Sequence, residues 1–178
     1  GGWMVEGVLE KERMEGKIAK VLEEAHRFVK RNIKTKAIIG DGGREDRTEY
    51  TMTAVREAVI NALVHRDYSI HTEGMPIQIQ MFEDRMEIRN PGGIYGRLRI
   101  DQLGKMQPDT RNPVLASALE VLGITENRYS GITTIRRERE KYSLRETVYL
   151  AERANFAEIF YTTQKDTIDD QSDVRQRQ

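Results

Sequence analysis

Apolar residues recur every three or four positions between residues 11 and 32, a spacing typical of an amphipathic helix. A second helix is predicted at residues 53–66, and because it is apolar on nearly every side we expect it to be buried. Two shorter helices are predicted at residues 113–123 and 132–140. The first of these two begins with a proline, and Asn112 is its expected N-cap.

Strand patterns lie between these helices. Residues 76–82 and 86–89 alternate apolar and polar side chains, and the short charged connection between them indicates a hairpin. Further strands are predicted at 37–39, 146–150 and 156–162, whereas the charged stretch 44–49 is expected to be a solvated loop or sheet edge, and 97–111 is expected to be irregular. A sheet of this kind needs one face covered. The pattern therefore predicts an α+β two-layer sandwich, with a mixed, mostly antiparallel sheet and helices on one face.

Composition limits the classes of protein that remain. The chain has 178 residues, and we expect one domain over residues 1–163 followed by a disordered tail or linker at 164–178. It has no cysteine, which excludes disulfides and thiolate chemistry, and its net charge of zero provides no global field for nucleic acid. We see no membrane span or signal peptide, and expect a cytoplasmic fragment of a longer protein.

The buried helix carries a narrow polar stripe. Glu57, Asn61 and His65 follow one another at one-turn intervals and therefore share one side of the helix. Two interpretations stay open. The stripe is an exposed edge, with Glu57 paired to an arginine, or it lines a site. In a site, the carboxylate would orient a water and the amide oxygen would ligate a hard cation such as Mg²⁺. No second carboxylate is evident against Glu57, so a carboxylate-pair hydrolase is ranked last.

A second candidate motif closes the predicted hairpin, where the chain reads Asn90-Pro91-Gly92-Gly93. A polar side chain at a strand end, followed by glycines, lets a ligand approach the backbone closely. A plain Pro-Gly turn is the alternative interpretation.

Four motifs in order, REAVINALVHRDYS, IQIQMFEDRMEIRNPGGI, RNPVLASALEVLGI and YSGI, resemble the ATP-binding domain of the GHKL superfamily. The branch that the chain most resembles occurs in bacterial and archaeal proteins classed as transcriptional regulators, often labelled RecG-like helicase-related or divergent AAA. The resemblance covers roughly residues 11–162. It implies a Bergerat-like fold in which ATP lies between the helices and the sheet.

The resemblance also implies roles for particular residues. By position, Glu57 matches the water-activating carboxylate and Asn61 the Mg²⁺-binding asparagine, while His65 either contacts the ligand or is structural. Asn90 stands where relatives have an adenine-binding aspartate. The glycine motif and the end of the phosphate loop supply the remaining cofactor-binding positions, which are Gly92, Gly93, Ser130 and Gly131. The chain departs from the superfamily at Val64, Asn90 and Tyr129, where relatives tend to have Asp, Asp and Gly.

Two functional hypotheses remain. In the first, the domain binds nucleotide and acts as a switch or a weak Mg²⁺-dependent ATPase within a regulator that forms homo-oligomers. DNA contact would then come only through domains absent from this chain. In the second, Tyr129 closes the pocket, and a degenerate scaffold serves oligomerisation in a DNA-binding regulator. An open cleft beside Glu57, Asn61 and Asn90 favours the first hypothesis, and a filled one favours the second.

Overall fold

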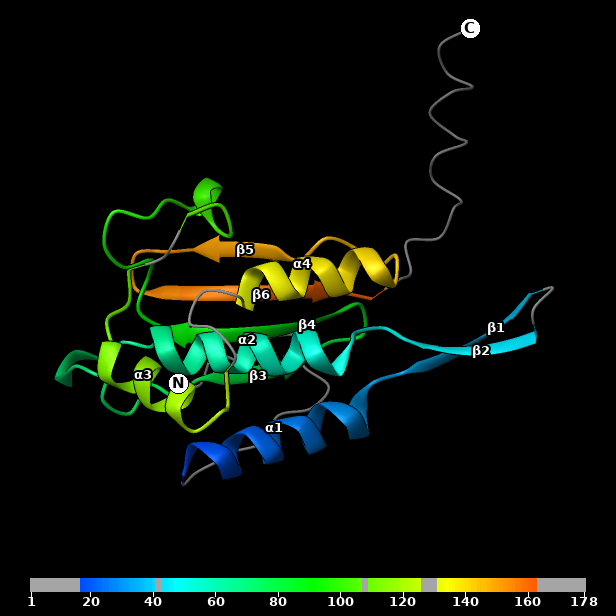
Figure 1. Cartoon of the computed structure of the whole chain (residues 1–178), viewed down its shortest axis with the longest axis horizontal. Coiled ribbons are helices and arrows are strands. Elements are labelled where there is room, and N and C mark those ends of the chain that lie inside the picture. The colour runs from blue at the N-terminus through cyan, green and yellow to red at the C-terminus, as the bar shows by residue number, and fades with distance from the viewer. Residues whose placement is uncertain (1–16, 41–42, 107–108, 126–130, 163–178) are drawn as a thin grey trace, which may run out of the picture.

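The computed structural model describes residues 17–40, 43–106, 109–125 and 131–162 (Figure 1). The elements in these residues are α1 (Ile18–Asn32), β1 (Thr35–Gly40), β2 (Gly43–Thr48), α2 (Met52–His65), β3 (Gln78–Met81), β4 (Arg85–Pro91), α3 (Pro113–Val121), α4 (Gly131–Lys141), β5 (Val148–Ala151) and β6 (Asn155–Tyr161). Two single-turn 3-10 helices, η1 (Ile70–Thr72) and η2 (Ile100–Gln102), lie in the connections before β3 and after β4.

The main sheet is open and has the strand order β3-β4-β6-β5, with every neighbouring pair antiparallel. Its register places Ile88 of β4 opposite Glu158 of β6, and Asn90 opposite Phe156. Side chains alternate between the two faces along a strand, so these four side chains share one face. That face is the one that packs against the helices, because Ile88 belongs to the main hydrophobic core.

Strands β1 and β2 form a separate antiparallel hairpin, in which Thr35 pairs with Thr48 and Gly40 pairs with Gly43. Figure 1 shows this hairpin extending away from the layered body. Residues 44–49 were expected to be a solvated loop or a sheet edge, and residues 44–48 are a strand. Both strands of a two-stranded hairpin are edges, where charged residues are well tolerated.

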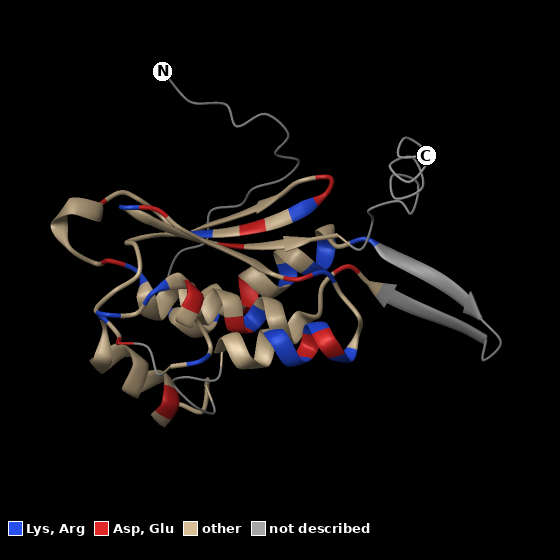
Figure 2. Cartoon of the chain, turned by 90° about the horizontal axis from the view of Figure 1, so that it is seen from above, with Lys and Arg blue, Asp and Glu red and all other residues tan. Residues whose placement is uncertain are grey.

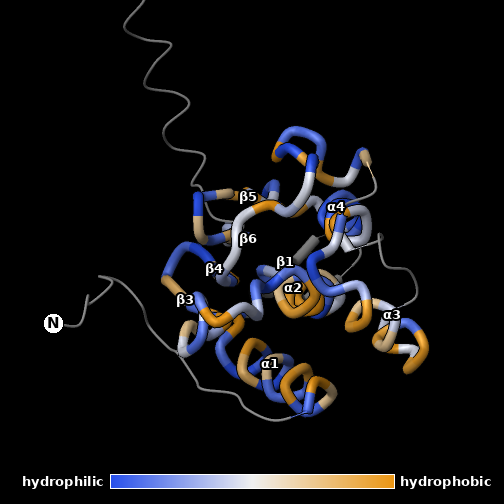
Figure 3. Tube along the Cα trace, turned by 90° about the vertical axis from the view of Figure 1, so that its left-hand side faces the viewer, coloured by the Kyte–Doolittle hydropathy of each residue, from blue (hydrophilic) through white to orange (hydrophobic). Residues whose placement is uncertain are grey.

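The helices lie on one side of the main sheet, with α2 directly against it (Figures 2 and 3). Helix α2 begins at a side-chain cap, because the Thr51 hydroxyl oxygen accepts a hydrogen bond from the Ala54 N–H at 3.2 Å. Its buried residues pack between α1 and the sheet, in a core that includes Phe28, Val29, Val55, Ala58, Val59, Ala62, Met86, Ile88 and Phe160. The expectation of a helix buried on most sides is therefore confirmed.

The α+β sandwich is confirmed, although the sheet pairs in the described residues are all antiparallel rather than mixed. Helix α1 starts at Ile18, because Lys17 has an extended backbone with ψ of 146°; residues 11–16 of the predicted helix lie outside the described residues. Tyr129, Ser130 and the predicted tail at 164–178 also lie outside them. The single domain over 1–163 stays a prediction.

Asn112 is the N-cap residue of α3, as predicted, but its side chain makes no capping hydrogen bond there. Its Nδ2 instead donates hydrogen bonds to the backbone oxygens of Val64 at 2.8 Å and Arg66 at 2.7 Å. The last carbonyls of a helix have no partner within it, and here an asparagine from a distant segment satisfies them at the end of α2.

Candidate functional site

The polar stripe of α2 is only partly buried, although Thr53 and Arg56 on the same helix are more exposed. Glu57, Asn61 and His65 are each partly exposed, whereas the neighbours Ala58, Ile60, Ala62 and Val64 are buried. Asn61 and His65 line a cleft between α2 and the sheet. Glu57 does not line this cleft. It lies in a smaller adjoining cavity, whose wall also includes Asn61, His65 and Gly131.

The cleft holds about 70 Å³ of enclosed free space, and its open mouth widens into solvent. Helix α2, the sheet, the loops after β4 and the start of α4 each supply part of the lining, which consists of Asn61, His65, Asn90, Gly93, Ile94, Tyr95, Leu98, Leu103, Gly104, Met106, Asp109, Gly131, Ile132, Phe156 and Glu158. The cleft is thus mostly apolar, with a few polar groups at its base.

Asn90 is one of these polar groups. It lies near the end of β4, opposite Phe156, and is only 2% exposed. Its Nδ2 is 3.4 Å from the Pro91 backbone oxygen, a long hydrogen bond that holds the side chain only weakly. The structure therefore brings Asn90 and Asn61 to one cleft from two different layers of the fold, as the sequence predicted.

The two motif glycines play different parts. Gly93 lines the cleft, but Gly92 does not. Gly92 has a φ of +98°, and a Cβ at this position would lie 2.9 Å from the Cβ of Asp67. Its N–H donates to the Ala154 backbone oxygen at 2.7 Å. Gly92 is thus required for the turn and for close packing behind the cleft wall, rather than for ligand approach.

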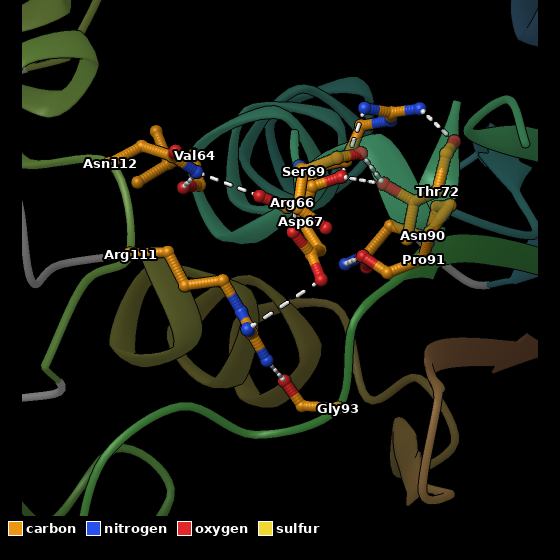
Figure 4. A network of polar contacts seen from close by, with 10 residues as sticks. All are labelled: Val64, Arg66, Asp67, Ser69, Thr72, Asn90, Pro91, Gly93, Arg111 and Asn112. Atoms are coloured by element: carbon orange, nitrogen blue, oxygen red, sulfur yellow. Dashed lines mark hydrogen bonds and ion pairs between the residues drawn. The ribbon is translucent and has the colours of Figure 1, made fainter. Parts of the chain in front are cut away.

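The turn that follows α2 is held by a network of polar contacts (Figure 4). The Asp67 N–H donates to the Pro91 oxygen at 2.8 Å, and the Asp67 carboxylate accepts from the Ser69 N–H at 2.8 Å. Hydrogen bonds from Ser69 lower the pKa of Asp67. Arg111 donates to the Gly93 oxygen at 3.0 Å and lies 3.9 Å from the Asp67 carboxylate. Asp67 and Arg111 therefore tie the end of α2 to the glycine turn.

His65 sits between this network and the cleft. Burial lowers its pKa, and the positive charge of Arg111 lowers it further. The neutral imidazole is therefore favoured at neutral pH. In this form His65 has one donor and one acceptor nitrogen for a ligand or for local backbone.

Asn61 lies at the centre of the site. Its Nδ2 donates to the Glu158 Oε1 at 3.5 Å, at the long limit for a hydrogen bond. Its Oδ1 faces the start of α4, where a Cβ added to Gly131 would be only 2.4 Å away. Only glycine at 131 leaves Asn61 in this position. The base of the cleft and the cavity that contains Glu57 thus meet at the Asn61 side chain.

The sequence patterns did not assign a role to Glu158 or Arg111, and they assigned Asn112 only to the N-cap of α3. Glu158 lies on β6 and is only 2% exposed, and the sequence carried one signal for it, a single charged residue within an apolar strand. Burial and the negative charge of Glu57 raise the pKa of Glu158 to about 8, although the hydrogen bond from Asn61 acts in the opposite direction. A second carboxyl group therefore does lie near Glu57. The contacts that Arg111 and Asn112 make had no sequence signal, because their partners are far away in the sequence.

Metal ligation was also predicted at this site. In the described ranges no group of three or more His, Cys, Asp or Glu side chains could hold a metal ion. An ion that arrives with a nucleotide needs only one or two protein oxygens beside phosphates and water. The Asn61 amide oxygen and the Glu57 carboxylate fit that limited requirement.

Fold and site together define a two-layer α+β domain with a small-molecule cleft between one helix and an antiparallel sheet. Residues 74–160 match the family model HATPase_c_4, described as "Putative ATP-dependent DNA helicase recG C-terminal", so this segment is similar to that family. The family implies nucleotide binding.

No curated protein matches the chain. Among solved structures it is similar to the DIP2311 protein from Corynebacterium diphtheriae, with a TM-score of 0.75 and 19% identity. The match covers 86% of this chain and 31% of that protein, so this chain corresponds to about a third of it and the likeness is one of fold. No helix in the described ranges is long and apolar enough to span a membrane.

Proposed function

We propose that this domain binds ATP in the cleft, with the base over Asn90 and the phosphates toward Asn61 and Gly131. The observation that carries the proposal is the convergence of Asn61, Asn90 and Gly131, from α2, β4 and α4, on one mostly apolar cleft. The implied family function supports the same interpretation. The cleft lined by Asn61 and Asn90 supports nucleotide binding, and Tyr129, the residue expected to close it in a degenerate scaffold, lies outside the described residues.

The two ends of the cleft suit the two ends of a nucleotide. Asn90 offers an amide beside apolar side chains such as Ile94 and Phe156, a setting suited to a purine base. The cleft also meets the first turn of α4, where the N-terminal N–H groups and the helix dipole favour negative charge. A Mg²⁺ ion bound with the nucleotide would neutralise phosphate charge, with Asn61 as its protein ligand.

Glu57 is positioned for a possible slow hydrolysis. Its cavity adjoins the phosphate end through Asn61 and Gly131. A carboxylate there can accept a proton from an attacking water. Glu57 is therefore proposed to act after binding, so that its removal lowers turnover more than affinity.

The proposed role of binding is a switch. Leu98, Leu103 and Met106 line the cleft from the segment after β4, and Met106 is 57% exposed. A nucleotide that buries these side chains would stabilise one arrangement of the segment. In a longer transcriptional regulator, this change would bias the packing of other domains or of a second copy, and DNA would be contacted outside this chain.

The test is a titration of Mg²⁺-ATP into the chain, followed by calorimetry and melting temperature. Saturation at one hundred times the dissociation constant should stabilise the fold by about 2.7 kcal/mol. Asn90→Ala should lose this stabilisation, and Glu57→Ala should keep it while losing turnover. Glu83→Ala, in the exposed turn between β3 and β4, is the control. No response to millimolar nucleotide in the unsubstituted chain would refute the proposal.

A further inference from the structure

The β1–β2 hairpin stands apart from the layered body of the fold (Figure 1). Its two strands pair with each other, and among the described residues no third strand pairs with either of them and no helix packs extensively against them. A two-stranded hairpin by itself is only marginally stable in water, and it usually needs a further strand or a packed helix. The described part of one chain supplies neither for this hairpin.

The pairing within the hairpin leaves its apolar residues without apolar partners. Each of three consecutive apolar residues of β1 is opposite a charged residue of β2: Ala37 is opposite Asp46, Ile38 is opposite Glu45 and Ile39 is opposite Arg44. Lys36 is opposite Arg47, and like charges in directly opposite positions destabilise an antiparallel pair. Well-matched cross-strand pairs contribute about 0.2–1 kcal/mol each, so β1 gains less from β2 than it would gain from an apolar strand.

The two outer edges of the hairpin differ in sequence. Strand β2 has four consecutive charged residues, Arg44 to Arg47, and a charged edge strand resists the addition of another strand. Strand β1 has a single charged residue and two adjacent isoleucines, a residue type that favours strands. The backbone N–H and C=O groups along an apolar edge strand are a template for pairing with another chain. Strand addition is therefore favoured at β1 and opposed at β2.

An antiparallel copy of β1 matches β1 better than β2 does. Two identical strands that pair antiparallel are related by a two-fold axis, so the residue at the axis is opposite its own counterpart. With this axis at Ile38, Ile38 is opposite Ile38 of the second copy, and Ala37 of each copy is opposite Ile39 of the other. Lys36 is then opposite the uncharged Gly40. All three apolar residues of β1 gain apolar partners in this register, and no two like charges are opposite each other.

We propose that β1 is a dimerisation edge: the β1 strands of two copies of this chain pair antiparallel about a two-fold axis at Ile38. The resulting sheet has the order β2-β1-β1-β2, and charged strands form both of its outer edges, so the assembly closes at two copies. This four-stranded sheet supplies the further strands that a two-stranded hairpin lacks. The contact is small, since β1 has six residues, and small interfaces are typically transient. Dimerisation is therefore reversible and depends on concentration.

The test is sedimentation equilibrium of the nucleotide-free chain from micromolar to millimolar concentration. The mass of the unsubstituted chain should rise toward that of a dimer. Ile38→Lys should weaken dimerisation by about tenfold or more, because it replaces an apolar pair at the axis with two like charges. This variant gains an opposite charge within its own hairpin, since Glu45 is opposite position 38.

A charge-reversed partner tests the register directly. The variant that combines Ile38→Glu with Glu45→Lys also has opposite charges across its own hairpin, and by itself it should dimerise as weakly as Ile38→Lys. An equimolar mixture of the two variants should recover a dimer, because opposite charges then meet at the axis. Glu45→Lys alone is the matched control, since it alters only β2, and it should dimerise as the unsubstituted chain does.

The melting temperature of each variant confirms that the core built on α2 and the main sheet is folded. If the unsubstituted chain remains monomeric at millimolar concentration, or if Ile38→Lys dimerises equally well, β1 is not the dimerisation edge. A mixture that does not recover the dimer overturns the pairing with Ile38 at the axis. The ATP titration of Ile38→Lys should match that of the unsubstituted chain, so failure of this inference is distinguishable from failure of nucleotide binding.

Discussion

Glutamates on opposite faces of one sheet should respond to pH in opposite ways. Glu158 is buried on the helix side of the sheet with a single long hydrogen bond to Asn61, and its pKa is raised to about 8. Glu87 is buried on the other face, where Arg85 and Arg89 contact its two carboxylate oxygens at 2.6 and 2.8 Å. Replacing each by glutamine removes its titration at little change in volume. We expect Glu158→Gln to stabilise the fold at neutral pH.

The magnitude follows from the two pKa values of Glu158. The folded state binds the Glu158 proton more tightly than the unfolded state does. The contribution of protonated Glu158 to stability is therefore complete below the unfolded pKa of 4.5 and is lost as the pH rises through about 8. The advantage of glutamine over glutamate grows over the same pH range. Neutral pH lies about 2.5 units above the unfolded value, and at about 1.4 kcal/mol per unit the glutamate costs about 3 kcal/mol that glutamine does not. At pH 5 the difference should be about 1 kcal/mol or less.

The assay is urea unfolding of the nucleotide-free chain at pH 5 and at pH 7 with EDTA present. Glu87→Gln is the mirror control. Burial alone would raise the pKa of Glu87, but the hydrogen bonds and charges of Arg85 and Arg89 lower it. The contribution of ionised Glu87 to the stability of the fold is therefore present above its unfolded pKa and is lost as the pH falls through its folded pKa. The Glu87→Gln variant should therefore be less stable than the unsubstituted chain at pH 7. Equal stability of Glu158→Gln and the unsubstituted chain at both pH values would refute the reasoning.

Three further predictions concern single contacts. Gly131→Ala should weaken ATP binding by about tenfold or more with little loss of stability, as measured by calorimetric titration. The reason is that the added Cβ would collide with the Asn61 Oδ1 and displace the Asn61 side chain. Asn112→Ala should destabilise the fold by about 1–3 kcal/mol in urea unfolding, since the carbonyls of Val64 and Arg66 lose their donor. Gly92→Ala should cost about 1–3 kcal/mol by the same measurement. Gly74→Ala, at a φ of +78° with no heavy atom near the added Cβ, should cost less, and an equal cost would contradict the packing against Asp67.

Much of the fold was predictable from periodicity. The alternation in residues 76–82 and 86–89 predicted the β3–β4 hairpin, and the apolar content of 53–66 predicted a buried helix, because hydrophobic burial imposes the period of each element on the sequence. The start of α1 and the strand at 44–48 were not determined in this way. Backbone pairing with β1 decides β2, and the charged sequence of this strand has no alternating apolar pattern.

The site was only partly predictable. One-turn spacing was sufficient to place Glu57, Asn61 and His65 on a single side of α2, and glycines at a strand end marked the turn that contains Gly93. Spacing within one helix fixes which residues share a face, since the helical period is local. It cannot specify which strand lies opposite that face.

The sequence by itself therefore determined the elements, their apolar faces and the polar stripe of α2. Only the tertiary structure decided that β6 pairs with β4 in a register that sets Glu158 beside Asn90, and that Gly131 closes on Asn61. The physical reason is that register and helix docking depend on how distant segments pack against each other. A carboxyl group buried by that packing, such as Glu158, acquires its raised pKa from neighbours that are far away in the sequence.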